Sequence, residues 1–232
     1  AISKYIKRSG EHGERMTTKD YAFLNKNFII QKMKYINGIY WLFEDEYRNS
    51  NYWEGNRPIP QFFEDPAKTE MNCMRQTISD ISSRSWVHHI PRLMVLSNLA
   101  MLADINPAEF LAWMRRVFID AADWVMVPNV IGMSMNADGG KIMSKPYIAG
   151  GSYISKMSNY CDSCSFNPKL RVGDTACPFT TFYWNFVDNN FETLSKNQRI
   201  SMQISGIKRL KDLDLIRIEA PQKFKALQKG DL

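Results

Sequence analysis

Hydrophobic residues recur with the period of an α-helix along most of this chain, and almost no segment shows the alternation of a half-buried strand. The clearest helix start is Asn106–Glu109: an Asn can cap the helix, Pro107 takes the first helical position, and Glu109 follows three residues after the cap. Apolar residues then continue at helical spacing as far as Pro128, where we expect the helix to end. The chain is therefore predicted to be all-α.

Helical spacing predicts several more helices. They are expected over residues 19–45, where the pattern is weaker, and over residues 69–83, 90–103, 178–194 and 195–229. We expect Gly206 and Pro221 to interrupt the last of them, because Gly lowers helix propensity and Pro removes a backbone hydrogen bond.

Within the segment that starts at Asn106, Trp113, Asp120 and Trp124 would lie on one face of a single helix. A carboxylate buried between two indole rings needs a partner, because burying an unpaired charge is costly. One interpretation is that Asp120 caps a neighbouring helix, and the other is that it binds a ligand. Trp124 is interpreted as a packing residue.

The stretch between Pro128 and Cys177 differs from the rest, because it holds several Gly and Pro residues and shows no sustained periodicity. So long an irregular stretch within a compact domain is uncommon, and it usually carries function or is disordered. Its Met and Tyr side chains favour burial and argue against disorder. We therefore expect another part of the protein to hold this stretch in place.

With 232 residues, of which 44% are hydrophobic, the chain is long enough for one large domain, or for one domain with an appended segment. This composition excludes a disordered chain, a collagen-like repeat and a small disulfide-stapled scaffold. The longest apolar stretch, Leu93–Ala103, is about half of the ~20 residues that span a bilayer. No secretory signal opens the sequence, so we expect a cytoplasmic protein with no membrane partner.

The formal net charge of +6 is concentrated at the two ends of the chain. Residues 1–37 hold eight basic and three acidic side chains, and residues 195–232 hold nine and four. Two cationic ends on a slightly acidic body favour a polyanionic partner such as nucleic acid. The alternative is that the Lys-rich ends only aid solubility.

The four cysteines are the strongest chemical signal. Cys161 and Cys164 are separated by two residues, Cys177 follows shortly afterwards, and Cys73 lies far upstream. In a cytosolic protein such a set indicates a metal site rather than disulfides. Cys177 precedes Pro178 at an expected helix start, where the helix dipole favours a thiolate.

Cys73 would come from a separate helix and so tie the irregular stretch to the upstream part of the chain. The spacing alone leaves three interpretations open: a tetrahedral zinc site, an iron–sulfur cluster, and buried thiols without a metal.

Several motifs occur in the order in which they occur in a known protein family. They are Gly38–Trp41 (GIYW), Trp86–Met94 (WVHHIPRLM), Asp120–Val125 (DAADWV), Pro128-Asn129, Ala137–Gly140 (ADGG), Lys145–Tyr147 (KPY), Tyr153-Ile154, Met157-Ser158, Tyr160–Cys164, Cys177–Phe179 (CPF) and Tyr183-Trp184. From about Gly38 to its end, the chain resembles the C-terminal half of the iron–sulfur bacterial cryptochromes and photolyases, a family that includes prokaryotic (6-4) photolyases and deoxyribodipyrimidine photolyase-related proteins.

The resemblance implies a helical FAD-binding domain over residues 38–232, with a 4Fe–4S cluster on Cys73, Cys161, Cys164 and Cys177, and so favours iron–sulfur over zinc. Residues 1–37 match poorly and are interpreted as a remnant of upstream helices. Proteins of this family use light-excited reduced FAD to repair UV-damaged DNA, often the (6-4) lesion, or to sense light. An antenna chromophore is expected only if an upstream domain exists, and we expect a monomer.

Three positions depart from the family pattern. Met126 stands where an acidic residue is expected, Met114 replaces an aromatic residue, and Asp65 replaces a Trp. By resemblance, these positions concern the surroundings of the flavin's reactive nitrogen and the route of its photoreduction.

The resemblance also assigns roles to individual residues. Arg92, Asp120 and Asn129 are candidate flavin contacts, and Trp113 is a candidate flavin contact and catalytic electron relay, because an excited flavin can oxidise an indole.

His88 and His89 precede Pro91, a residue tolerated in the first turn of a helix, so we expect the pair to lie where the backbone geometry changes. Paired histidines are more often packed structural residues than catalysts. An imidazole can nevertheless donate and accept a proton near neutral pH, and repair of a (6-4) lesion requires a proton to move. By resemblance, His89 is the better catalytic candidate, with His88 beside it.

Tyr147 and Tyr153 match family positions close to the damaged base, and Lys145 is placed to meet a DNA phosphate. A lesion must leave the duplex to reach a buried flavin, so this chemistry requires stacking aromatic side chains and cations around the pocket. The alternative for either Tyr is packing within the irregular stretch.

The leading hypothesis is a DNA photolyase-like lyase, in which reduced FAD donates an electron to a flipped pyrimidine lesion, His89 moves a proton, and the cluster holds the irregular stretch. One alternative is a photoreceptor of the same family that does not repair DNA. Another is a flavin-free iron–sulfur module that binds nucleic acid.

Overall fold

The computed structural model describes residue 38 and residues 40–232. Its elements are a helix over residues 40–48, followed by η1 (Gln61–Phe63), η2 (Pro66–Lys68), α3 (Asn72–Arg84), α4 (His89–Pro91), η3 (Arg92–Ser97), α5 (Asn98–Leu102), α6 (Pro107–Val117), α7 (Asp123–Val127), η4 (Pro128–Ser134), α8 (Gly151–Met157), η5 (Tyr160–Ser163), α9 (Pro178–Asn189), α10 (Phe191–Ser195), η6 (Gln198–Ile200), α11 (Ser201–Ile207) and α12 (Leu213–Lys229).

Within this described part there is no β-sheet, only two isolated bridges between Arg57 and Ile105 and between Asn167 and Ala176. The all-α prediction is confirmed. The N-terminal segment expected over residues 1–37, and most of the weak helix expected over residues 19–45, lie outside the described residues. None of the helices within residues 40–232 combines the length and the apolar character needed to cross a membrane.

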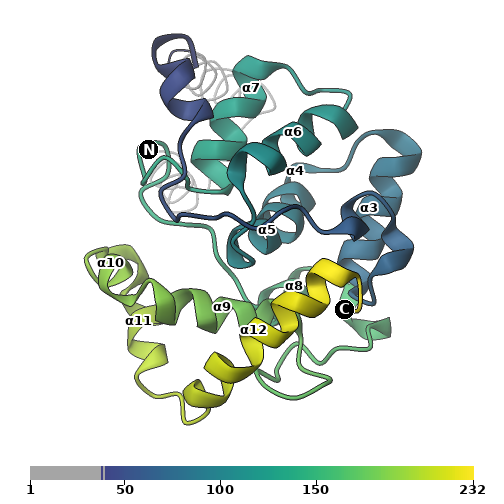
Figure 1. Ribbon diagram of the computed structural model, residues 1–232, viewed down its shortest axis with the longest axis vertical. Coiled ribbons are helices and arrows are strands. Elements are labelled where there is room, and N and C mark those ends of the chain that lie inside the picture. Colours follow the sequence, from purple (N-terminus) through teal and green to yellow (C-terminus); the bar gives the residue numbers. More distant parts are fainter. Residues whose placement is uncertain (1–37, 39) are drawn as a thin grey trace, which may run out of the picture.

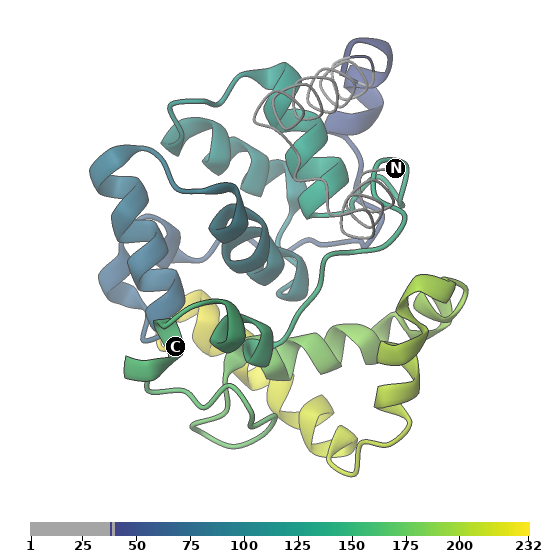
Figure 2. The same cartoon turned by 180° about the vertical axis from the view of Figure 1, so that it is seen from behind.

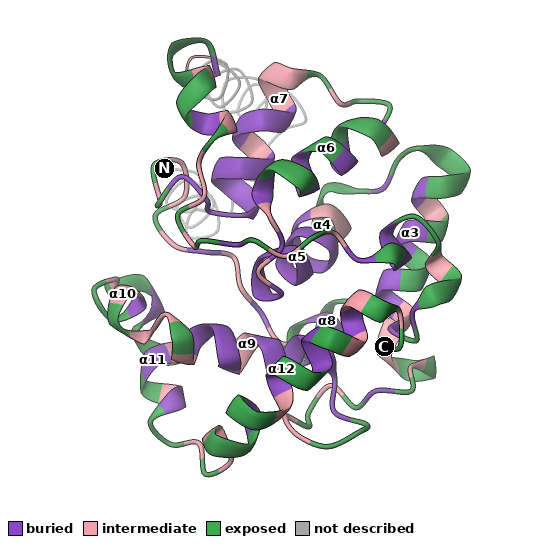
Figure 3. Cartoon of the chain, viewed as in Figure 1, coloured by how far each residue is buried: buried purple, intermediate pink, exposed green. Residues whose placement is uncertain are grey.

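The helices form two groups that share one hydrophobic core. In Figure 1, α3 to α7 lie in the upper part of the molecule and α9 to α12 form an arch along its lower edge. The rings of Phe182 on α9 and Phe224 on α12 stack with centroids 4.3 Å apart. Trp53 meets Phe186 of α9 edge-to-face at 5.1 Å and so joins the two groups. Buried residues gather where the groups meet, and every residue of α5 is buried (Figure 3).

The C-terminus closes back on the start of α3. The Thr69 hydroxyl donates a hydrogen bond to the Leu232 carbonyl over 2.5 Å. Figure 2 shows the C-terminus beside α3 from behind, as Figure 1 shows it from the front. The end of the chain that follows α12 is therefore anchored just ahead of α3, the helix that carries Cys73.

Helix α6 begins as the sequence predicts. The Asn106 side chain accepts hydrogen bonds from the backbone N–H groups of Ala108 at 2.9 Å and Glu109 at 3.3 Å. These bonds satisfy donors that have no partner within the helix, as the capping prediction requires.

The same helix ends earlier than predicted. Phe118 adopts an extended backbone, and Ile119 donates its N–H to the Ser85 carbonyl at 3.0 Å. The chain thus leaves the helix because it pairs with the end of α3. The prediction that Trp113, Asp120 and Trp124 share one helix face is wrong: Asp120 lies in the loop after α6, and Trp124 lies in α7.

Two prolines lie inside helical runs, where an end or an interruption was predicted. At Pro128 the chain passes directly from α7 into η4, a π-helix, whose wider turn suits a residue without an N–H. Pro221 lies within α12. There the buried face formed by Ile216, Ala220 and Phe224 outweighs the lost backbone bond. Conversely, Asn190 divides the helix expected over residues 178–194 into α9 and α10.

The stretch between Pro128 and Cys177 is less irregular than predicted, because it contains η4, α8 and η5. It is also held by polar anchors away from the cysteines. The fully buried Asn98 on α5 donates to the Ala149 carbonyl at 2.8 Å and accepts from the Ala149 N–H at 3.0 Å. Buried Asp138 accepts from the Tyr47 hydroxyl at 2.7 Å and from the Ile142 N–H at 2.9 Å.

The Asn98 anchor gives a stability prediction. Asn98→Ala leaves the buried N–H and C=O of Ala149 without partners, so we expect the free energy of unfolding to fall by about 2–4 kcal/mol. Denaturant unfolding at equilibrium measures this change through the transition midpoint. The matched control is Asn49→Ala, whose side chain bonds the Asp45 carbonyl on an exposed surface and should change the midpoint little. Equal midpoints for wild type and Asn98→Ala would contradict this role for Asn98.

Candidate functional site

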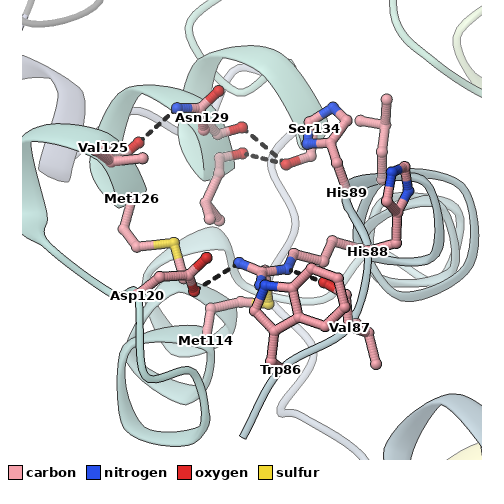
Figure 4. A pocket seen from close by; sticks show the side chains of 13 residues that line it. Trp86, Val87, His88, His89, Met114, Asp120, Val125, Met126, Asn129 and Ser134 are labelled. Carbon is pink, nitrogen blue, oxygen red and sulfur yellow. Dashed lines mark hydrogen bonds and ion pairs between the residues drawn. The ribbon is translucent and has the colours of Figure 1, made fainter. Parts of the chain in front are cut away.

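A cavity of about 360 Å³ lies between the helical run that starts at α4 and the run formed by α7 and η4. Its walls come from residues 86–93, from Met114 at the end of α6, from Asp120, and from residues 125–134. Figure 4 shows these side chains pointing towards the same space. The structure therefore brings together five residues that the sequence marked as site candidates: His88, His89, Arg92, Asp120 and Asn129.

Arg92 is held in a fixed position at this cavity. Its Nε donates to the Val87 carbonyl at 2.9 Å, and its Nη1 donates to the Asp120 carboxylate at 2.8 Å. The guanidinium carbon lies 3.9 Å from the centre of the Phe118 ring. The Arg92 side chain is 14% exposed and that of Asp120 is 49% exposed. The expectation of a buried Asp120 between two indoles is wrong, because its partner is Arg92 at the rim of the cavity.

The histidine pair lies at the start of α4, as predicted. His88 is the N-cap residue, and its Nδ1 accepts the backbone N–H of Ile90 at 3.2 Å. The Nδ1 atom of His88 is thus engaged in capping α4. His88 and His89 both have exposed side chains at the cavity.

Two π-helical segments, η3 and η4, form facing walls of the cavity. In η4, the Asn129 amide donates to the Val125 carbonyl at 2.7 Å, and the Ser134 hydroxyl donates to the Asn129 carbonyl at 2.8 Å. Side chains thus satisfy backbone carbonyls that the wider turns leave available. Isolated π-helical turns are rare and occur often at functional sites.

Trp113 does not line this cavity. It is 2% exposed, and its indole N–H donates to the Phe63 carbonyl at 3.1 Å. Its ring lies in an aromatic cluster, 4.8 Å from that of Phe63 and 6.4 Å from that of Phe118. Phe118 in turn touches Arg92, so one ring separates Trp113 from the cavity wall. Met114, the next residue in the chain, reaches the cavity instead.

Tyr153 lies in a second cavity of about 320 Å³ on the other side of α4, which it shares with Ile90, Pro91 and Met94. His89 at the first cavity and Ile90 at the second are adjacent in sequence, so the two cavities flank one turn of backbone. Tyr147 packs against a small buried cluster formed by Leu93, Met94, Met133 and Ala149.

Lys145 is half-buried, and within residues 40–232 it makes no ion pair. None of the three nucleic-acid candidates, Lys145, Tyr147 and Tyr153, lines the cavity that holds the histidine pair.

All four cysteines are free thiols, and all four line a third, small cavity. Cys73 comes from the first turn of α3, Cys161 from η5, Cys164 directly after η5, and Cys177 caps the start of α9. The predicted contribution of Cys73 from a separate helix is confirmed. The start of α3 is also tied to this loop, because the Asn72 amide donates to the Tyr160 carbonyl at 2.8 Å.

Burial disfavours the charged form of Cys73, Cys161 and Cys177. It raises the pKa of Cys73 well above its ordinary range, and the other three cysteines raise it further. Burial raises the pKa of Cys177 to about 12, against a lowering by the backbone N–H groups of Phe179 and Thr180. The pKa of Cys161 is also raised, first by burial and then by Cys164. Four thiolates around this cavity would therefore need a positively charged centre between them.

Gly151, the first residue of α8, marks how tightly this cavity is enclosed. A Cβ at this position would lie 2.7 Å from the Cys177 sulfur and 3.0 Å from the Thr180 hydroxyl oxygen. Only glycine permits this approach of α8 to the cysteines. Among the described residues, however, no group of three or more His, Cys, Asp or Glu side chains is arranged to hold a metal ion.

No protein-family model matches the chain. A (6-4) photolyase from Agrobacterium fabrum is 47% identical over 173 residues, which make up 75% of this chain and 34% of that protein. The chain belongs to the photolyase and cryptochrome family. An uncharacterized protein from Acanthamoeba polyphaga mimivirus is 31% identical over 107 residues, or 46% of this chain and 80% of that protein.

The resemblance to photolyases and cryptochromes is thus confirmed, and the chain spans about a third of the length of the Agrobacterium photolyase. Within this photolyase-family chain, the structure adds residues that the sequence did not mark. Phe118 supports Arg92, and Ser134 stabilises the turn that carries Asn129. The sequence signal for Ser134 was its place at the end of an apolar run, which is too common to identify a site.

Proposed function

We propose that this chain is the flavin- and cluster-binding part of a light-dependent DNA-repair protein. The proposed repair transfers an electron from reduced FAD to a flipped UV lesion, the (6-4) photoproduct. The observation that supports this most is the meeting of His88, His89, Arg92, Asp120 and Asn129 at one cavity in a member of the photolyase family. The repair activity, the lesion and the DNA partner all belong to the proposal.

The first cavity fits a flavin in its chemistry. Leu93, Met114, Met126 and Val130 provide apolar walls for a flat ring system, and Arg92 provides a fixed cation for a polar edge. When bound, the flavin supplies the light-driven electron. Arg92, which Asp120 holds in place, would bind and orient the flavin. Asn129 would contribute amide atoms at the opposite wall of the cavity.

Proton movement is assigned to His89. The family resemblance favours His89, which lines the first cavity, as the group that donates and accepts a proton at the lesion. Tyr153 lies beside this turn and Tyr147 packs on the cluster that contains Leu93 and Met94, and stacking of either ring against a flipped base would keep the lesion in place. Lys145 would bind a backbone phosphate.

The third cavity offers four thiols, which is the ligand set of either a tetrahedral zinc ion or a 4Fe–4S cluster. We assign the cluster because the cysteine motifs resemble those of the iron–sulfur photolyases and cryptochromes. A 4Fe–4S cluster is larger, and each cysteine binds a different iron, so thiols spread around one cavity suit it. Cys73, Cys161, Cys164 and Cys177 would hold the cluster, which would supply the positive centre that their burial requires.

Substitution of Asp120 tests the flavin site. Asp120→Asn keeps the size of the side chain but removes the charge that holds Arg92, so we expect FAD to bind about tenfold to a hundredfold more weakly. Fluorescence titration of the flavin-free protein with FAD measures this affinity. The control is Asp80→Asn, which removes a carboxylate from an exposed pair with Arg84 and should leave FAD binding unchanged. An unaltered affinity in Asp120→Asn would exclude Asp120 from the flavin site.

Two further variants separate DNA binding from repair. Lys145→Ala should weaken binding to damaged and undamaged duplex alike, with a shallower dependence on salt, because a phosphate contact carries no lesion specificity. His89→Ala should lower repair under blue light by about 10²–10⁴-fold while changing binding little. Gel-shift titrations at two salt concentrations and a repair assay on the same proteins measure both quantities. Equal repair by His89→Ala and wild type would favour a photoreceptor that does not repair DNA.

A further inference from the structure

Lys223, on the last helix, is the most deeply buried lysine of the described chain, with 8% of its surface exposed. Lysine is almost never buried unless it is paired, because its ammonium loses its hydration. Its neighbours on α12, Ala220 and Phe224, belong to the core that α12 forms with α9. The position of Lys223 therefore requires an electrostatic reason.

Within residues 40–232, the hydrogen bonds of the Lys223 ammonium go to backbone carbonyls. Its Nζ donates to the Gly173 carbonyl at 3.0 Å and to the Ala176 carbonyl at 3.2 Å. Ala176 is itself fully buried and directly precedes Cys177. One turn earlier on α12, the Glu219 carboxylate accepts the Gly173 N–H at 2.7 Å. Glu219 and Lys223 thus hold Gly173 by both of its backbone polar groups.

Residues 171–176, the segment that precedes Cys177, are also attached to the N-cap of α12. Arg171 Nε donates to the Asp212 carboxylate at 2.7 Å. Residues 171–176 are therefore fixed to α12 at several points, and Lys223 provides the contact nearest to Cys177. Figure 1 shows α12 running past the start of α9, where Cys177 lies.

Carboxylates act on the Lys223 ammonium without pairing with it directly. Burial lowers the pKa of Lys223, while Glu219, Asp174 and Cys177 act in the opposite direction. Within residues 40–232 no carboxylate lies in an ion pair with Lys223. A cluster on four thiolates would be anionic, so it would add negative charge on the Cys177 side of this ammonium.

We propose that Lys223 is a positioning residue for the cysteine cluster: it holds the segment that ends at Cys177 and places a positive charge behind that ligand. This inference rests on the proposed cluster for its charge effect, but not for its effect on the segment. It predicts that Lys223 controls both how fast Cys177 becomes accessible and the reduction potential of the cluster.

Three substitutions separate these two effects. Lys223→Met removes the charge and both hydrogen bonds while keeping an apolar stem. Lys223→Gln keeps a donor without the charge, and Lys223→Arg keeps both. Lys225→Met, at an exposed position on the same helix, is the matched control. Mass spectrometry of iodoacetamide-treated, metal-free protein measures the alkylation of Cys177, and spectroelectrochemistry of the iron–sulfur-loaded protein measures the potential.

We expect Cys177 in Lys223→Met to be alkylated about tenfold or more faster than in wild type, because the loss of two hydrogen bonds favours local opening of the segment. Lys223→Gln should be alkylated more slowly than Lys223→Met but should show a more negative cluster potential than wild type. Lys223→Arg should restore the wild-type potential, and Lys225→Met should match wild type in both measurements.

Wild-type alkylation in Lys223→Met would overturn the positioning role, and a wild-type potential in Lys223→Gln would overturn the charge effect. If wild-type protein contained no iron and sulfide, the proposed function would fail. The alkylation rates would then still decide whether Lys223 holds the segment that ends at Cys177.

Discussion

The meeting of four thiols, two of them buried, around one small cavity is the constraint on which the other parts of this structure depend. The start of α3 must meet the turn η5 and the start of α9, which lie much later in the sequence. Because burial makes the ionisation of Cys73 and Cys177 costly, the arrangement is favourable with neutral thiols or with a positively charged centre. The cluster that we propose would be such a centre, and Lys223 would hold the segment that ends at Cys177.

This cavity also fixes the surface at which we place the lesion. Gly151 must approach the Cys177 sulfur closely, and so determines where α8 begins. Tyr153 and Ile154, which follow Gly151 on α8, line the second cavity together with Ile90 and Pro91. Ile154 and Tyr160 line both the cysteine cavity and the second cavity. A change in the cysteine site would therefore be transmitted to Tyr153 through direct packing.

The sequence predicted some parts of this arrangement because they depend on local chemistry. The Asn106 cap and the helix start at Cys177-Pro178 need only a few neighbouring residues. The end of α6 depended instead on the pairing of Ile119 with Ser85, which periodicity cannot indicate. For that reason Asp120 lies at the rim of the first cavity and not on the predicted helix face. Its assignment to the site came from the family motif, which does not depend on where the helix ends.

The positions of Trp113 and Lys223 also depend on tertiary packing, which local sequence patterns cannot indicate. An indole at helical spacing gives no indication of which side of the helix meets a cavity, and Trp113 points into the aromatic cluster. Lys223 was one of nine basic residues in a cationic terminus, and only the tertiary fold distinguishes it from its exposed neighbours.

Analysis of iron and acid-labile sulfide in the anaerobically purified protein tests the role of the four cysteines most directly. A 4Fe–4S cluster on Cys73, Cys161, Cys164 and Cys177 predicts about four iron and four sulfide per chain, with loss of both in Cys161→Ser. One zinc per chain with no iron or sulfide would contradict it.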